Sequence, residues 1–240
     1  MVFPGSVIYV DPYLTDNVAH VEGPEMARQF PLAMRAEDVV DADWVLVTHI
    51  HLDHCDVHSL VPIAQGSPSC RFMCPDECAT VLRAAGIDEA RIATASETWA
   101  PLNPAVKVIA VPAAHPRVER DAKGNLRFIG YVLEYDGRRI YHAGDTSPAH
   151  EIIDKLETLL PIDTAFLPVN ERNFYRELRG IIGNMSVREA FQLARELKVR
   201  TLVPMHWDMF SPNSVYVEEI RLLFELMKPP FEMRIYPDQI

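Results

Sequence analysis

The feature that most constrains this chain is a histidine-rich segment that directly follows a hydrophobic run. Trp44 to Thr48 has the pattern of a buried strand, and residues 48–54 read Thr-His-Ile-His-Leu-Asp-His. At the alternating spacing of a strand, the side chains of His49 and His51 point to the same side. The chain must therefore fold so that a buried strand ends in a cluster of polar side chains.

Three imidazoles and one carboxylate lie within six residues of this segment. Asp53 and His54 follow the two strand histidines, as the chain turns toward a helix that includes Ser59 to Gln65. Imidazole and carboxylate ligands together suit Zn²⁺, Mn²⁺ or Fe²⁺, whereas an all-oxygen site would suit Mg²⁺ or Ca²⁺. A polar surface turn is the alternative interpretation, but four potential ligands at this spacing favour a metal centre.

Strand-like and helix-like segments alternate along the rest of the chain, with no linker and no repeat. The sequence therefore predicts one α/β domain over residues 1–240. Strands are expected at Val7 to Val10, Trp44 to Thr48, Arg71 to Met73, Val106 to Val111, Arg127 to Glu134, Arg138 to His142, Thr164 to Pro168, Thr201 to Pro204 and Met233 to Tyr236. Further helices are expected at Asp76 to Ala85, His150 to Leu159, Ser186 to Leu197 and Val217 to Met227.

Two local patterns support these boundaries. Ser186-x-x-Glu189 is a capping box at the start of a helix. Tyr135-Asp136-Gly137 indicates a hairpin between two strands. The segments Asn17 to Val39 and Asn170 to Met185 are long polar connections, and loops of that length in a compact domain are usually functional or disordered.

Charge and hydropathy limit the partners. The chain has 34 acidic and 23 basic residues, a net charge of −11, which disfavours the phosphate contacts on which nucleic-acid binding depends. No apolar run approaches the ~18 residues that span a bilayer, and Met1 to Val10 does not resemble a signal peptide. We expect a soluble cytoplasmic protein that acts on a small molecule, without nucleic acid or membrane.

Three more potential ligands stand where an expected strand gives way to a loop: His115, Asp145 and His206. Ligand sites in α/β proteins assemble at the ends of strands. Gly144, next to Asp145, allows the backbone to approach a metal closely. Each of these residues is a weak indication by itself.

Together these motifs resemble, in order, those of the metallo-β-lactamase superfamily: Asp11, residues 49–54, His115, Asp145 and His206. The resemblance spans nearly the whole chain. Residues 141–146 (Tyr-His-Ala-Gly-Asp-Thr), 170–172, 183–185 and 204–210 are similar to the L-ascorbate-6-phosphate lactonase branch, a manganese-using group.

The resemblance implies an αββα sandwich with two divalent metal ions, Mn²⁺ or Zn²⁺ with Fe²⁺ as an alternative, at one edge. One ion would take His49, His51 and His115; the other would take Asp53, His54 and His206, with Asp145 bridging both. Asp53 and Asp145 would then be the catalytic carboxylates. Asp11 would orient a ligating imidazole, and His142 and Asp208 are further candidates for such contacts. An inward-facing structural role is the alternative for His142.

The sequence departs from the superfamily at its start. Members usually have about two strands before the one that ends at the equivalent of Asp11, and only ten residues precede Asp11 here. At typical lengths of ~5–6 residues those strands do not fit, so the sandwich is expected either to lack its first strands or to complete the sheet edge otherwise. An uncovered edge favours association between copies, and we expect a homo-oligomer.

Substrate contacts are expected from Asn170, Arg172 and Arg176, since the loop after Thr164 to Pro168 forms the substrate pocket in the lactonase-like branch. An arginine fork suits phosphate or carboxylate; a solvated loop of mixed charge is the alternative. The four cysteines fit no common metal-binding spacing and are expected to be reduced packing residues: Cys55, Cys70, Cys74 and Cys78.

The function predicted is metal-dependent hydrolysis of a small, anionic substrate such as a lactone or phosphoester. The same scaffold serves di-iron redox enzymes, nucleases and non-catalytic metal-binding modules. The net charge and the length disfavour the nuclease and the flavin-linked redox enzyme, and the full ligand set disfavours the binding module. The substrate and the metal are left open.

Overall fold

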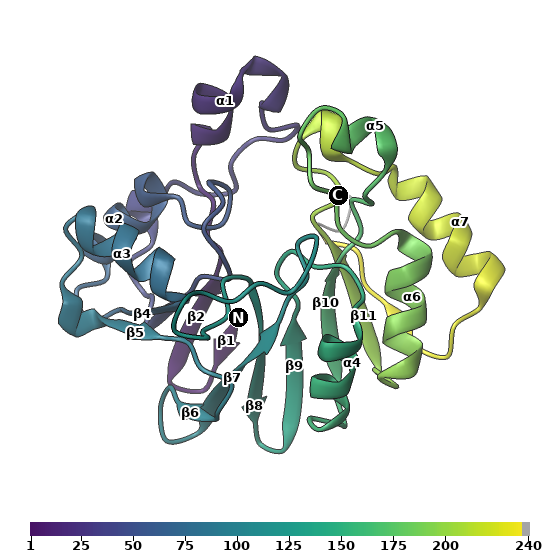
Figure 1. Ribbon diagram of the computed structural model, residues 1–240. Coiled ribbons are helices and arrows are strands. Elements are labelled where there is room, and N and C mark those ends of the chain that lie inside the picture. Colours follow the sequence, from purple (N-terminus) through teal and green to yellow (C-terminus); the bar gives the residue numbers. More distant parts are fainter. Residues whose placement is uncertain (237–240) are drawn as a thin grey trace.

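The computed structural model describes residues 1–236 and contains two β-sheets (Figure 1). The first sheet has the order β1-β2-β3-β4-β5, and the second has the order β12-β11-β10-β9-β8-β7-β6. The strands of the first sheet are β1 Val2–Phe3, β2 Ser6–Val10, β3 Trp44–Leu46, β4 Arg71–Cys74 and β5 Ile92–Thr94. Those of the second are β6 Ala100–Pro101, β7 Val106–Pro112, β8 Ile129–Tyr135, β9 Arg138–His142, β10 Thr164–Pro168, β11 Thr201–Met205 and β12 Glu232–Met233.

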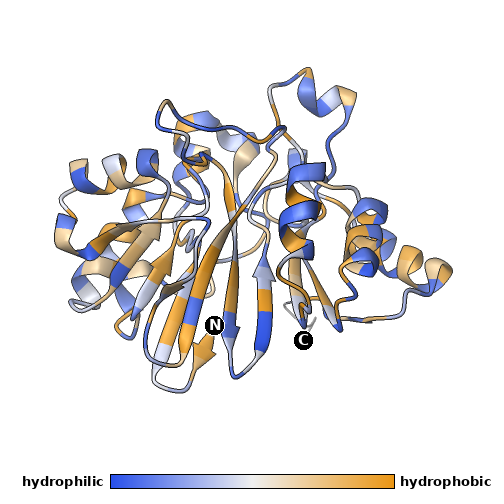
Figure 2. Ribbon diagram, turned by 60° about the horizontal axis from the view of Figure 1, so that its bottom comes forward, coloured by the Kyte–Doolittle hydropathy of each residue, from blue (hydrophilic) through white to orange (hydrophobic). Residues whose placement is uncertain are grey.

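Helices cover the outer face of each sheet. On the first sheet, α2 (Val57–Gly66) and α3 (Asp76–Ala84) bury Leu60, Ile63 and Leu82 against β3 and β4. On the second, α4 (His150–Glu157), α6 (Val187–Glu196) and α7 (Val217–Met227) pack on β9, β10 and β11. Figure 2 shows apolar residues gathered along the central strands and polar residues alternating with them on the helices. The expected αββα sandwich is confirmed.

The two sheets meet through a third apolar cluster. Leu46 and Met73 of the first sheet pack against Val108 and Leu133 of the second. The Tyr131 hydroxyl on β8 lies 2.8 Å from the carbonyl oxygen of Val47 and 3.0 Å from that of Met73. This fully buried hydroxyl therefore joins the two sheets with a hydrogen bond.

The expected hairpin and capping box are both present. Tyr135 pairs with Arg138 across a two-residue turn in which Asp136 and Gly137 have φ of 49° and 72°. The Ser186 side chain accepts a hydrogen bond from the Glu189 amide, and the Glu189 carboxylate accepts one from the Ser186 amide. Most other expected elements are found with ends shifted by one or two residues, as is usual.

Three differences have physical reasons. A two-residue strand, β1, pairs antiparallel with β2, so the edge is completed by a short strand. The strand expected from Arg127 begins only at Ile129, because the Arg127 amide donates to the Glu119 carbonyl and not to a neighbouring strand. The last expected strand, Met233 to Tyr236, is instead the two-residue β12, Glu232–Met233. Strands of two or three residues are too short for the alternation of polar and apolar residues to predict them.

The two long connections lie above the same edge of the sheets (Figure 1). The first contains α1 (Asn17–Glu22) and two short 3₁₀ turns, Pro24–Met26 and Ala36–Asp38. The second contains α5 (Phe174–Glu177). Within residues 1–236, no helix is both long and apolar enough to cross a membrane.

The Tyr131→Phe substitution should lower the free energy of unfolding by about 1–3 kcal/mol, because a buried carbonyl of the facing sheet loses its donor. Tyr141→Phe is the matched control: Tyr141 is equally buried on the next strand, but its hydroxyl has no hydrogen-bond partner within residues 1–236. Urea unfolding of the metal-free proteins measures both changes. Equal losses in the two variants would show that the hydroxyl of Tyr131 does not stabilise the sandwich.

Candidate metal centre

The predicted ligands come together at the carboxyl ends of four strands. Residues 48–54 follow β3, His115 follows β7, Asp145 follows β9 and His206 follows β11. Within the second sheet, β7, β9, β10 and β11 all run in the same direction, so their ends share one edge. The first sheet contributes His49, His51, Asp53 and His54 from the facing side.

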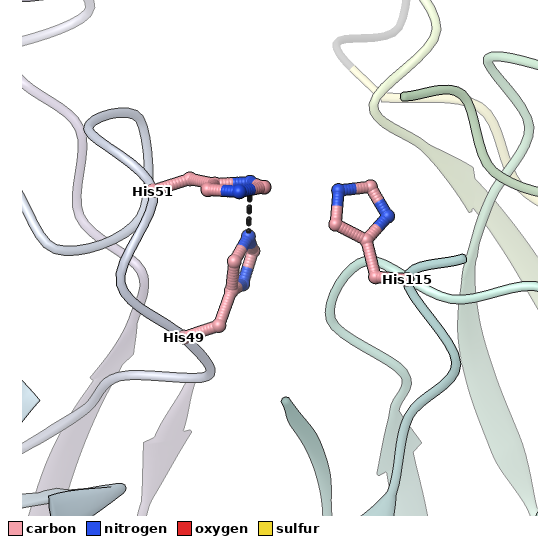
Figure 3. Close-up of side chains that lie close together, drawn as sticks. All are labelled: His49, His51 and His115. Carbon is pink, nitrogen blue, oxygen red and sulfur yellow. Dashed lines mark hydrogen bonds between the residues drawn. The ribbon is translucent and has the colours of Figure 1, made fainter. Parts of the chain in front are cut away.

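The first donor set consists of His49, His51 and His115 (Figure 3). His49 Nε2 lies 3.0 Å from His51 Nδ1. The ring of His115 approaches from the opposite side, with its centroid 5.1 Å from that of His51. One nitrogen of each ring faces a common point, with all three nitrogens within 4.8 Å of one another.

The second donor set consists of Asp53, His54 and His206. His54 Nε2 lies 3.3 Å from His206 Nε2 and 3.5 Å from Asp53 Oδ2. His206 Nε2 lies 3.2 Å from Asp53 Oδ2. These three atoms therefore form a nearly equilateral triangle.

Asp145 faces both sets. Its Oδ1 lies 3.5 Å from His54 Nε2 and 3.4 Å from His206 Nε2, whereas its Oδ2 lies 3.6 Å from His115 Nε2. Oδ1 is buried and has no hydrogen-bond partner among the described residues. A buried carboxylate oxygen without a partner is costly, and a cation between the sets would satisfy it.

The spacing fits a divalent metal ion. Metal–ligand bonds of ~2.0–2.2 Å place tetrahedral ligands about 3.3–3.6 Å apart, and the distances around Asp145 and within the second set are 3.2–3.6 Å. The donors are imidazole nitrogens and carboxylate oxygens, which favour Zn²⁺, Mn²⁺ or Fe²⁺ over Ca²⁺.

Burial and neighbouring charges set the protonation states of the ligand side chains. Some of these side chains are already in the state that binds a metal ion, and others carry a proton that the ion would displace. Burial lowers the pKa of His115 to about 4 and that of His49 well below its usual value, so both rings are neutral ligands. Burial acts in the same direction on His206, but Asp145 and Asp53 outweigh it and raise its pKa to about 9. Burial would raise the pKa of Asp53, but His54 and His206 hold it at about 2. Anionic carboxylates here attract protons to imidazoles, and a metal ion would replace those protons.

Asp11 and Thr48 orient two of the ligands. Asp11 Oδ2 accepts hydrogen bonds from His54 Nδ1 at 2.8 Å and from the Thr48 hydroxyl at 2.6 Å. The Thr48 oxygen lies 3.0 Å from His49 Nδ1. Because a carboxylate only accepts, protons on the Nδ1 atoms leave Nε2 of both rings free for a metal. Thr48 carries no sequence signal of this role beyond its place before His49.

Gly144 brings the loop of Asp145 against the first sheet. A Cβ atom on Gly144 would lie 2.7 Å from the Ile129 carbonyl oxygen and 2.9 Å from the Thr48 Cβ, and its φ is 60°. Both the close approach and the left-handed backbone require glycine.

Among the described residues, neither His142 nor Asp208 forms a hydrogen bond to a residue of the two metal-donor sets. His142 Nδ1 accepts from the Gly144 amide at 3.3 Å, and its ring stacks on Phe166. His142 therefore supports the turn that leads to Asp145. The Asp208 carbonyl, rather than its carboxylate, accepts a hydrogen bond from Gln29.

The three residues expected to bind substrate lie outside the cavity at the centre. Asn170 is buried and accepts from Asn184 at 2.9 Å; Arg172 pairs with Glu189 at 3.3 Å; Arg176 donates to the backbone carbonyls of Asn170, Glu171 and Ser214. Sequence spacing alone does not show which side chains of a long loop turn inward.

The cavity has a volume of about 720 Å³ and opens above the two donor sets. Its one arginine among the lining residues is Arg179, from the same loop. The walls combine apolar and acidic side chains: Val18, Glu22, Glu25, Met26, Ile50, Leu52, Ile181, Ile182, Phe210 and Pro212. The cysteines are buried free thiols, and none belongs to a donor group in the described part of the chain.

Known proteins share these features. A beta-lactamase superfamily domain matches residues 7–207. A UPF0173 metal-dependent hydrolase from Pyrococcus abyssi is 31% identical over 219 residues, which cover 90% of this chain and 84% of the relative. An N-acyl-phosphatidylethanolamine-hydrolyzing phospholipase D from Caenorhabditis elegans is 25% identical, over 93% of this chain and 65% of the relative.

Among solved structures, the metallo hydrolase Igni18 from Ignicoccus hospitalis has the same fold, with a TM-score of 0.71 and 21% identity over 98% of this chain and 88% of that one. The chain belongs to the beta-lactamase superfamily and is a metal-dependent hydrolase. The superfamily predicted from the motifs is confirmed, whereas the lactonase-like branch stays a prediction.

Asp11→Asn should weaken metal binding about 10–100-fold, because the amide no longer fixes the imidazole protons on Nδ1. Asparagine tolerates the left-handed backbone of residue 11, so the fold should persist. Asp41→Asn, which removes an exposed carboxylate bound to Tyr9, is the control. Zinc titration against a chromophoric chelator measures the affinities. Unchanged affinity in Asp11→Asn would refute the orienting role.

Proposed function

We propose that this chain hydrolyses a lactone or phosphoester bond in a small molecule and uses two divalent metal ions to do so. The proposal rests on the position of Asp145, whose two carboxylate oxygens face two separate donor sets. One carboxylate between two sets suits a pair of ions better than one. Mn²⁺ and Zn²⁺ are the ions we favour, with Fe²⁺ as the alternative.

When bound, such a pair lowers the pKa of a water between the ions toward neutrality and polarises the attacked carbonyl or phosphoryl oxygen. The role of the protein is to position that water and to exclude other water molecules from the site. His51, Asp53 and Asp145 line the cavity floor, so the reacting group would meet them directly. Asp53 lies at the cavity, and we assign it the transfer of the proton released by the attacking water to the leaving-group oxygen.

The cavity suits a molecule with an apolar part and an anionic group. A volume of about 720 Å³ is in the range of small-molecule sites. Val18, Leu52 and Phe210 provide apolar wall, and Arg179 provides the fork that phosphate or carboxylate favours. The related phospholipase D hydrolyses a phospholipid, which supports a phosphoester as substrate.

Acidic walls disfavour a nuclease. Glu22 and Glu25 line the cavity, and the net charge of the chain is −11. A nucleic-acid groove needs Lys and Arg along the phosphate path.

Assembly into a homo-oligomer stays a prediction.

Asp145→Asn should lower kcat/KM by more than about 100-fold, a loss of about 2.7 kcal/mol of transition-state stabilisation, because the shared anionic ligand is removed. Asp154→Asn, on the exposed face of α4, should leave the rate unchanged. The assay is a panel of lactones and phosphodiesters with Mn²⁺ or Zn²⁺ added. Turnover by Asp145→Asn at the unaltered rate would contradict the proposal.

Arg179→Glu should raise KM for anionic substrates of that panel and leave KM for neutral ones nearly unchanged. Arg172→Glu is the matched control from the same loop, since Arg172 is also exposed but turns toward Glu189. Steady-state kinetics with matched anionic and neutral substrates separate the two. A larger effect at Arg172 would place the anion contact there instead.

A further inference from the structure

Two residues at the second donor set have a left-handed backbone. Asp11, which holds His54, has φ of 46°, and His206 itself has φ of 58°. Such conformations are unfavourable for residues other than glycine and persist only where the surroundings hold them. Neighbouring residues must therefore hold both loops in this backbone conformation.

Arg28 lies between these two loops. Its guanidinium donates to the carbonyl oxygens of Tyr13 at 2.9 Å and Thr15 at 3.0 Å, both shortly after Asp11. On the other side its Nη1 lies 2.9 Å from Met209 Sδ, three residues after His206. The same side chain thus contacts the loop that orients His54 and the loop that carries His206.

The backbone continues this connection. Arg28 forms an antiparallel bridge with Phe210, and the Gln29 amide donates to the Met209 carbonyl at 2.9 Å. The Gln29 side chain donates to the Asp208 carbonyl at 2.8 Å. The loop after His206 is therefore fixed along three consecutive residues.

Arg28 cannot easily move away from this position. Its side chain is only 6% exposed, and the guanidinium carbon lies 4.6 Å from the centre of the Tyr13 ring. Tyr13 and Phe210 belong to one small apolar cluster that also contains Val18 of α1. An arginine buried in this way contributes through fixed geometry, because its planar fork loses little freedom for each hydrogen bond it makes.

We propose that Arg28 is a positioning residue for the metal set Asp53, His54 and His206. By tying the two loops together it keeps Nε2 of His54 and Nε2 of His206 3.3 Å apart, ready for one ion. The first set, His49, His51 and His115, has no ligand on either loop. Asp11 reaches it only indirectly, through Thr48 and His49, so it should depend on Arg28 less than the second set does. This inference rests on the proposed pair of metal ions but not on any substrate.

The chain offers a matched control in Arg91. Its guanidinium also donates to backbone carbonyls, those of Ala64, Ser67 and Cys70, and lies 5.6 Å from the Phe72 ring. It lies where β4 and β5 begin, at the opposite edge of the first sheet from the donors that follow β3. Arg28→Met and Arg91→Met each remove three hydrogen bonds and a contact with an aromatic ring. Arg28→Met also removes the ion pair of Arg28 with Asp16 at 3.7 Å, and only Arg28 contacts the loops beside the second donor set.

The experiment measures two successive Zn²⁺ dissociation constants by competition with a chelator, and assigns them with His51→Ala and His206→Ala proteins. Arg28→Met should weaken the second set about 10–100-fold and weaken the first set by less. Arg91→Met should lower the unfolding temperature and leave both constants unchanged. Weakening of both constants in both variants, or of neither, would overturn the proposal.

A gentler variant covers the case in which Arg28→Met does not fold. Gln29→Ala removes only the side-chain bond to Asp208 and should weaken the second set about 2–10-fold; an unchanged constant there would also count against the proposal. If the native chain binds a single ion, the proposed metal pair fails. The role of Arg28 is then decided in the His51→Ala protein, in which the second set is the one that keeps all three of its donors.

Discussion

The whole architecture depends on collecting five imidazoles and two carboxylates in one buried place. Such a collection is unfavourable by itself, since burial removes the hydration of each charged group. It becomes tolerable because imidazole nitrogens and carboxylate oxygens lie 3.2–3.6 Å apart and compensate one another, and a bound metal ion would compensate them further. The sandwich supplies the geometry: parallel strands of two sheets end at the same edge and point their loops at one another.

Much of this centre is visible in the sequence because its residues are local. His49, His51, Asp53 and His54 lie within six residues of one another, shortly after the buried strand β3. The hairpin after β8 and the capping box at Ser186 are equally local, since a few residues determine each of them. His115, Asp145 and His206 could be assigned only by resemblance to a family, because nothing near them in the sequence indicates a partner.

The features that were missed depend on tertiary contacts. Arg172, Arg176 and Arg179 are alike in the sequence, but only Arg179 lines the cavity, because Arg176 is held by three carbonyl oxygens and Arg172 by a glutamate. Arg28 has no motif around it, and its importance comes from a loop about 180 residues away. The two-residue strand β1 forms because β2 offers free hydrogen-bonding groups, and two residues carry too little pattern to predict a strand.

Each donor set takes ligands from both sheets: His49 and His51, or Asp53 and His54, from one, and His115 or His206 from the other. A bound ion would therefore be a cross-link between the two halves of the sandwich, joining residues as far apart in sequence as His54 and His206, 152 positions. Since the unfolded chain has no such site, every increment of binding free energy is added to the stability of the folded state. The supply of metal to this protein thus governs its lifetime as well as its chemistry, and an ion-starved chain would be lost to unfolding and proteolysis sooner than a loaded one.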